Sequence, residues 1–102
     1  MLKDYVEFTK TTAIYPKSHA VEYCAYGLAS EVGEVLGKLK KHIRDQEYDP
    51  EGMMAEMGDV FWYWVRLCDE LNIDVTSTIK YNMAKLQARK QKGTIKGSGD
   101  VR

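Results

Sequence analysis

Two pairs of acidic residues have the type and spacing that could hold a metal ion. Glu31 and Glu34 are spaced i, i+3, and so are Glu56 and Asp59. Residues with this spacing share one face of a helix, so each pair would direct two carboxylates the same way. Carboxylates that converge repel one another unless a cation binds or some of them take up protons. Because Mg²⁺ prefers oxygen ligands, two helices with these faces opposed would make a magnesium site.

Helical periodicity predicts an all-α chain, and no stretch alternates as a strand does. The predicted helices cover about residues 2–12, 18–44, 50–71 and 75–91. Ser18 is the expected N-cap of the second helix, and Asp49 followed by Pro50 is a start signal for the third. Asp74 would cap the fourth helix and Gly93 would end it.

The last three predicted helices each carry a narrow polar stripe beside an apolar face. The stripes contain, in order, Glu31, Glu34 and Lys38; Glu56, Asp59 and Tyr63; and Asn82, Lys85 and Arg89. The apolar face of the second helix, which we expect to join the core, contains Leu28, Val32, Val35, Leu36, Leu39 and Ile43. An acidic stripe that meets a basic one suits a metal–phosphate site. An amphipathic bundle whose polar stripes only face water would show the same periodicity.

Length and composition indicate one soluble domain over residues 1–102, with an N-terminal helix and connector at 1–17 and a glycine-rich tail at 93–102. Lys+Arg and Asp+Glu are 15 each, so no net field would recruit a nucleic-acid polymer or an acidic membrane. No apolar run is long enough for a membrane span, and the N-terminus lacks a signal-peptide pattern. Cys24 and Cys68 fit buried free thiols in a reducing compartment, so we expect a cytoplasmic location.

The order of the motifs resembles that of the MazG-like nucleotide pyrophosphohydrolases, members of the all-α NTP pyrophosphatase superfamily. An ExxE motif at residues 31–34 precedes an ExxD motif at residues 56–59. The resemblance continues through NMAKL at 82–86 and GSGDVR at 97–102, and spans about residues 25–102. The ordered combination is far more specific than ExxE alone.

The resemblance implies hydrolysis of a nucleoside triphosphate to its monophosphate and pyrophosphate, in the housecleaning of nucleotide pools. It also implies a four-helix catalytic bundle that a second subunit completes, in a homodimer or homotetramer, with Mg²⁺ as cofactor and Mn²⁺ as a substitute. Within the superfamily, hydrolysis of dUTP or phosphoribosyl-ATP is an alternative. A non-catalytic helical dimerisation module is another, although the four intact acidic positions weigh against it.

The resemblance also assigns roles to single residues. The expected Mg²⁺ ligands are Glu31, Glu34, Glu56 and Asp59. Of these, Glu34 is the candidate general base, with Glu31 as the second catalytic candidate. Side chains expected to contact the substrate are Lys38, Tyr63, Asn82, Lys85 and Arg89. The cationic members would stabilise charge on the leaving pyrophosphate.

The sequence leaves the roles of three further features undecided. Trp62 points about 100° away from the acidic stripe, which favours a subunit interface over stacking on a base. Gly33 and Gly37 weaken the second helix, so we expect another helix to approach them closely. Residues 97–100 would form a backbone anion nest, swap onto a neighbouring subunit, or fray.

Overall fold

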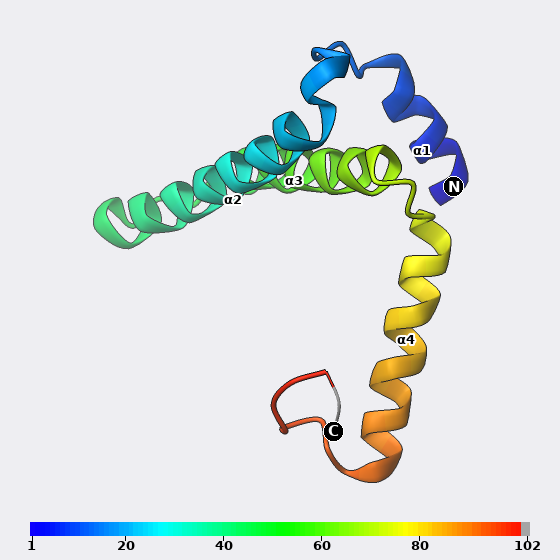
Figure 1. Ribbon diagram of the computed structural model, residues 1–102. Coiled ribbons are helices and arrows are strands. Elements are labelled where there is room, and N and C mark those ends of the chain that lie inside the picture. The colour runs from blue at the N-terminus through cyan, green and yellow to red at the C-terminus, as the bar shows by residue number, and fades with distance from the viewer. Residues whose placement is uncertain (101–102) are drawn as a thin grey trace.

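The computed structural model describes residues 1–100, which are helical and contain no strand. The helices are α1 (Leu2–Thr11), the short 3₁₀ helix η1 (Lys17–His19), α2 (Ala20–Asp45), α3 (Pro50–Glu70) and α4 (Val75–Lys92). Helices α2 and α3 form an antiparallel hairpin, α1 lies near the end of α3, and α4 leads away from the hairpin (Figure 1). The expected all-α class is confirmed. Completion of a four-helix bundle by a second subunit stays a prediction.

The predicted caps of α3 and α4 are present. The Asp49 carboxylate accepts a hydrogen bond from the Gly52 amide at 3.0 Å, and Asp74 accepts one from the Ser77 amide at 2.8 Å. Gly93 ends α4 in the left-handed region with φ of 71°. The helix ends lie within one residue of those expected, apart from the start of α2.

The prediction that Ser18 caps α2 is wrong. Ser18 lies inside η1, and the residue that precedes α2 is His19, whose side chain makes no capping bond. The His19 amide instead donates to the Pro16 carbonyl at 3.2 Å. The chain therefore enters α2 through a 3₁₀ turn, which satisfies an amide that a capping side chain would otherwise have to pair.

Two small apolar clusters form the core. One packs the connector and the start of α2 onto α3, and it contains Ala13, Tyr15, Ala20 and Cys24 with Trp62, Tyr63 and Leu67. The other joins α1, α3 and the start of α4, and it contains Val65, Cys68 and Val75 with Leu2, Tyr5, Val6, Trp64 and Ile79. Both clusters lie toward one end of the hairpin, so the other end is held by few core contacts.

A buried arginine on α3 links α1 and the connector to that helix. Arg66 is 4% exposed and donates to the Tyr15 hydroxyl at 3.1 Å and the Thr9 hydroxyl at 3.3 Å. It also pairs with Asp69 at 2.8 Å and Glu70 at 3.1 Å, and the Tyr15 hydroxyl donates to Glu70. The Tyr15 hydrogen bond, followed by Arg66, lowers the pKa of Glu70 despite burial. Burial lowers the pKa of Arg66, but its hydrogen bonds outweigh this and raise the pKa.

The single chain is open, and most of its apolar helix surface is uncovered. The radius of gyration is 16.7 Å, against about 13 Å for a compact domain of this length. Large apolar side chains exposed on the hairpin are Val32, Leu36, Leu39, Ile43, Met54, Met57 and Phe61. The expectation that the apolar face of α2 joins the core is therefore wrong for four of its members within one chain, because neither α1 nor α4 packs against α2 among the described residues. No helix within residues 1–100 has the length and hydropathy needed to cross a membrane.

Replacement of Arg66 tests the link between α1 and α3. Arg66→Met keeps helix propensity but leaves Glu70 without its cation, so we expect a loss of about 2–4 kcal/mol in the free energy of unfolding. Urea unfolding monitored by circular dichroism measures this loss. Arg44→Met removes an exposed ion pair with Asp45 and should cause no measurable change. Equal stability of the two variants would contradict a stabilising role of Arg66.

Candidate functional site

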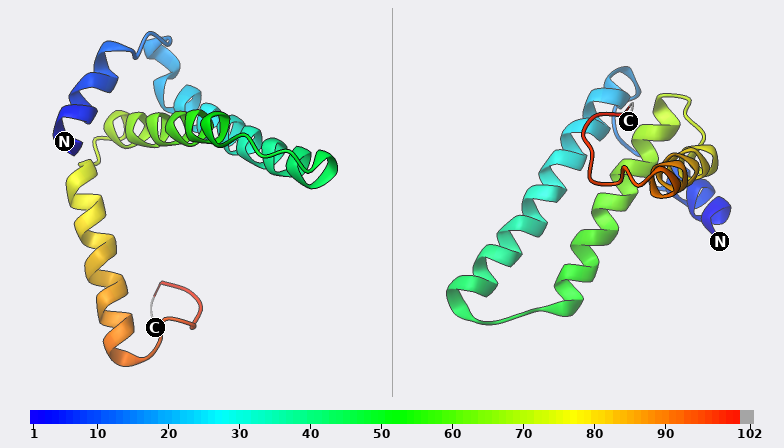
Figure 2. Two further views of the ribbon diagram at one scale, coloured as in Figure 1. Left: turned by 180° about the vertical axis from the view of Figure 1, so that it is seen from behind. Right: turned by 90° about the horizontal axis from the view of Figure 1, so that it is seen from below.

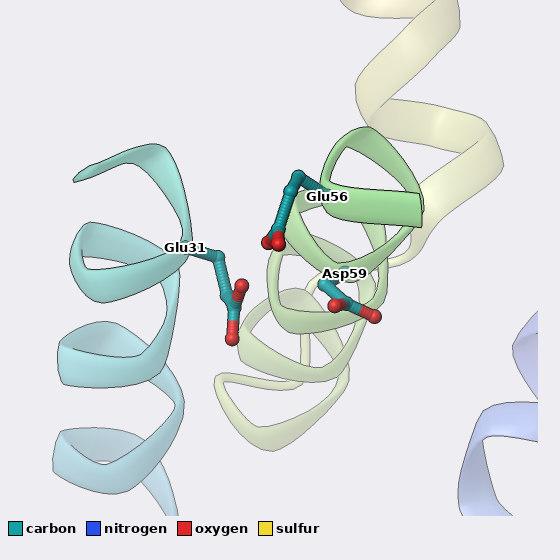
Figure 3. Close-up of side chains that lie close together, drawn as sticks. All are labelled: Glu31, Glu56 and Asp59. Carbon is teal, nitrogen blue, oxygen red and sulfur yellow. The ribbon is translucent and has the colours of Figure 1, made fainter. Parts of the chain in front are cut away.

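Three carboxylates converge between α2 and α3. Glu31 on α2 faces Glu56 and Asp59 on α3 (Figure 3). One oxygen from each carboxylate lies within 4.8 Å of one oxygen from each of the other two. Glu31 and Glu56 are half-buried and Asp59 is exposed, so the group lies at the surface of the hairpin and remains accessible. We call these residues the acidic cluster.

The electrostatics of the acidic cluster show charge that is not neutralised. Burial raises the pKa of the Glu31 carboxyl first, and a hydrogen bond with Glu56 raises it further. The charge of Asp59 acts in the same direction. Within residues 1–100, no ion pair to Lys, Arg or His involves a member of the cluster. A cation placed among these oxygens would relieve the repulsion.

The fourth acidic residue lies outside the cluster. Glu34 is exposed, and its oxygens do not meet the distance condition that joins Glu31, Glu56 and Asp59. Its charge still contributes to the raised pKa of Glu31, so it is close enough to act electrostatically. The structure therefore separates three carboxylates that could share one ion from a fourth that stands beside them.

Tyr63 lies one helical turn beyond Asp59, next to the acidic cluster. Burial raises the pKa of its hydroxyl, and Tyr23 and then Glu31 add to the effect. The ring lies directly against the backbone of α2 at Gly27, where a Cβ would overlap it. A residue without a side chain is thus required on α2 for the ring to sit at this position.

Apart from Tyr63, the expected substrate contacts make no ion pair with the acidic cluster within residues 1–100. Lys38 is half-buried near the start of α3, where its Nζ lies 3.2 Å from the position of a Cβ on Gly52. With Lys41 it lines a cavity of about 280 Å³ beside the α2–α3 loop. Asn82, Lys85 and Arg89 lie on α4, which leads away from the hairpin in Figure 1 and in the left view of Figure 2.

Comparison with known proteins gives the family. A family model described as the MazG nucleotide pyrophosphohydrolase domain matches residues 20–94. The chain belongs to this family. The Gene 37 protein of Mycobacterium phage L5 is 37% identical, over 89% of this chain and 90% of the relative, and its name states no activity. No solved structure matches.

Membership of the MazG family confirms the resemblance in the motifs and points to a nucleotide pyrophosphohydrolase. The matched region includes both acidic pairs and all five expected substrate contacts, and it excludes α1 and residues 97–100. The MazG family generally depends on divalent metals, which fits a group of carboxylates close enough to share one ion.

Tyr5 is a neighbour of the acidic cluster that the sequence of this MazG chain did not indicate. Tyr5 on α1 stacks on Phe61 with ring centroids 5.2 Å apart. Burial raises the pKa of its hydroxyl, and the charge of Asp59 raises it further. Its ring helps to line a cavity of about 910 Å³ between α1 and α3 that reaches Gly58, next to Asp59. Only its apolar position on the first helix is visible in the sequence, and nothing there indicates proximity to Asp59.

Trp62 has a role within the chain that the sequence did not indicate. Its indole N–H donates to the Thr12 hydroxyl at 2.8 Å, and its ring meets the ring of Tyr15 edge to face at 6.3 Å. These contacts join α3 to the connector after α1. Trp62 therefore helps to fix the N-terminal segment, whether or not it also meets a second subunit.

Neutralising Glu31 should stabilise the metal-free protein. Because the folded-state pKa of Glu31 is raised, its stabilising contribution exists at acidic pH and is lost as the pH rises through that pKa. At pH 7 in EDTA, Glu31→Gln should raise Tm by about 2–5 °C, the effect of a fraction of a kcal/mol. The gain should shrink as the pH falls through the raised pKa of Glu31, because the wild-type carboxyl then takes up a proton as well.

Glu34→Gln is the matched control for this measurement, since it removes the same charge from the same helix outside the acidic cluster. Its effect on Tm in EDTA should be the smaller of the two. A fall in Tm for Glu31→Gln at pH 7 would contradict the view that the cluster is under electrostatic strain.

Proposed function

We propose that the protein is a Mg²⁺-dependent nucleoside triphosphate pyrophosphohydrolase. It converts a nucleoside or deoxynucleoside triphosphate and water into the monophosphate and pyrophosphate, as a housecleaning enzyme of the cytoplasmic nucleotide pool. The observation that carries this proposal is the convergence of Glu31, Glu56 and Asp59 in a chain of the MazG family.

The donor set fits a hard divalent cation. All three members of the acidic cluster offer carboxylate oxygens, with no nitrogen or sulfur donor in the group, and this favours Mg²⁺ or Mn²⁺ over zinc. Glu31, Glu56 and Asp59 would hold the ion, with Glu34 as a further ligand or as the base. When bound, the ion neutralises phosphate charge and lowers the pKa of a coordinated water.

The side chains around the acidic cluster divide the remaining work. Glu34 is exposed and outside the cluster, so it is free to accept a proton from the attacking water. The water oxygen bonds to the α-phosphorus, and Glu34 takes a proton from that water. The bond between the α-phosphorus and the α–β bridging oxygen breaks, and this oxygen leaves with pyrophosphate. Glu31 orients this water relative to Glu34. The Tyr63 hydroxyl contacts the substrate beside these two residues.

A second copy of the chain would supply what one chain lacks. The apolar faces of α2 and α3 are exposed, and within residues 1–100 no atom beyond the local backbone of α2 and the chain neighbours of each glycine lies within 4 Å of a Cβ built on Gly33 or Gly37. A helix of a second copy packed there would cover these faces and form a four-helix bundle around the acidic cluster. In such a homodimer or homotetramer, Asn82, Lys85 and Arg89 would reach the phosphate chain from the neighbouring subunit, while Lys38 would act from the same helix as Glu31.

A panel of nucleotides tests the activity. With MgCl₂ and each of the common ribo- and deoxynucleoside triphosphates, dUTP and phosphoribosyl-ATP, we expect release of pyrophosphate measured by a coupled phosphate assay. Glu56→Gln and Asp59→Asn should lower kcat/KM by at least about 100-fold, since each removes a charge that stabilises the reacting state. Glu34→Gln should lower kcat similarly; Mg²⁺ binding retained in calorimetry would assign Glu34 as the base, and lost binding would assign it as a ligand.

Glu51→Gln is the control, because Glu51 is exposed on the first turn of α3, away from the acidic cluster. It should keep wild-type kcat/KM. Full activity in Glu56→Gln and Asp59→Asn would exclude catalysis at this site. No pyrophosphate from any nucleotide would favour the non-catalytic module.

The assembly is tested by mass. Light scattering after gel filtration should give at least twice the 11.7 kDa of one chain. Leu36→Glu places a charge on the exposed apolar face of α2, where Leu36 is 60% exposed in one chain, so it should shift the protein toward the monomer. A wild-type protein that stays monomeric at about 100 μM would contradict the shared bundle, since a stable dimer forms well below that concentration.

A further inference from the structure

The segment after α4 folds back and is held by two of the basic residues of that helix, Lys85 and Arg89. Lys85 Nζ lies 3.2 Å from a carboxylate oxygen of Asp100. Arg89 Nη2 donates to the backbone carbonyls of Asp100 at 2.8 Å and Gly99 at 3.2 Å. The segment curls beside the end of α4 (Figures 1 and 2), so residues 97–100 are held against that helix within one chain, while a swap onto a neighbouring subunit stays a prediction. Val101 and Arg102, which complete the GSGDVR motif, lie outside the described residues.

The charges in this contact are unevenly buried. The Arg89 side chain is 8% exposed, whereas the Asp100 carboxylate that faces it at 3.5 Å is 87% exposed. Lys85 first, and Arg89 second, lower the pKa of Asp100, so this carboxyl is ionised at neutral pH. A buried guanidinium thus has as its counter-charge a carboxylate that lies mostly in water. Pairs of this kind are weak and are weakened further by salt.

We propose that residues 97–100 are a strap that occupies the Lys85–Arg89 pair in the absence of substrate, and that a polyphosphate chain displaces the Asp100 carboxylate from it. The proposal rests on the proposed function, in which Lys85 and Arg89 bind the phosphate chain. Carboxylate and phosphate oxygens both accept from the guanidinium fork, but a triphosphate brings several charges where Asp100 brings one. The exchange therefore favours the phosphate chain at an equal local concentration.

A glycine in the strap gives a second, uncharged way to open it. Gly99 has φ of 80°, a conformation that a residue with a side chain adopts only with strain. Among the described residues, nothing other than the two chain neighbours of Gly99 lies within 4 Å of a Cβ built there, so Gly99→Ala would act through the backbone and not through a clash. Asp100→Asn weakens the strap through charge. The two variants should have the same effect for different physical reasons.

Hydrogen exchange of backbone amides tests the strap without metal and without hydrolysis. Inorganic triphosphate added to the metal-free protein in EDTA should speed exchange in residues 94–100, with saturation. Asp100→Asn and Gly99→Ala should exchange these amides faster without ligand and bind triphosphate about two- to fivefold tighter, the range for an exposed ion pair. Glu51→Gln, which removes a charge elsewhere, should match the wild type in both measurements.

Three results would overturn the strap: no binding of triphosphate, binding with unchanged or slower exchange in residues 94–100, or unchanged affinity in both strap variants. Circular dichroism confirms that the variants are folded. The two proposals can fail separately. A protein that hydrolyses no nucleotide but still releases the strap on triphosphate supports the strap and refutes only the proposed function.

Discussion

The repulsion among carboxylates held between α2 and α3 is the constraint on which the rest of the site depends. Glu31, Glu56 and Asp59 place oxygens within 4.8 Å of one another, and no basic side chain of the described residues pairs with them. The folded state must oppose this repulsion, because the packing of α2 against α3 has to hold the carboxylates together. Sites that bind a cation commonly carry such a cost, which the ligand then offsets.

The stability that opposes the repulsion comes from one end of the hairpin. Arg66 ties Thr9 and Tyr15 to α3, and the two apolar clusters lie around the same region. Beyond the acidic cluster, toward the α2–α3 loop, the apolar side chains of α2 are exposed. The hairpin is thus anchored where it meets α1, and the acidic cluster lies between the anchored end and the end without a packed core.

Local signals in the sequence predicted the helices well, because caps depend on neighbours in the chain. The carboxylates of Asp49 and Asp74 accept hydrogen bonds from the backbone amides three residues further along the chain. Gly93 ends α4 through its own positive φ. The buried Arg66 is different, because its hydrogen bond to Tyr15 spans 51 positions, a separation that no helical wheel describes. A wheel gives the direction of a side chain relative to its own helix, not the identity of the surface it meets.

For the same reason, spacing alone groups all four acids, whereas the structure brings three of them together. The i, i+3 rule placed Glu31 and Glu34 on one face, yet the distance across to α3 brings Glu31 into the acidic cluster and leaves Glu34 outside it. The angle between two helices decides which turn of one lies opposite which turn of the other, and this angle is set by packing along the whole contact. Sequence spacing contains no information on that register.

The separation of acidic and basic residues within one chain has a physical advantage under the proposed function. If Lys85 and Arg89 lay beside Glu31 and Asp59 in the same chain, they would form ion pairs and neutralise the oxygens that a cation needs. On α4 they are held apart, and the Asp100 carboxylate meets their charge instead. A polyphosphate can bind the acidic cluster and the basic residues at the same time. Some of its oxygens would contact the metal at the acidic cluster, and its other oxygens would contact the basic side chains. The chain has equal numbers of acidic and basic residues, so its net charge is zero. The acidic cluster and the Lys85–Arg89 pair nevertheless stay separate within one chain.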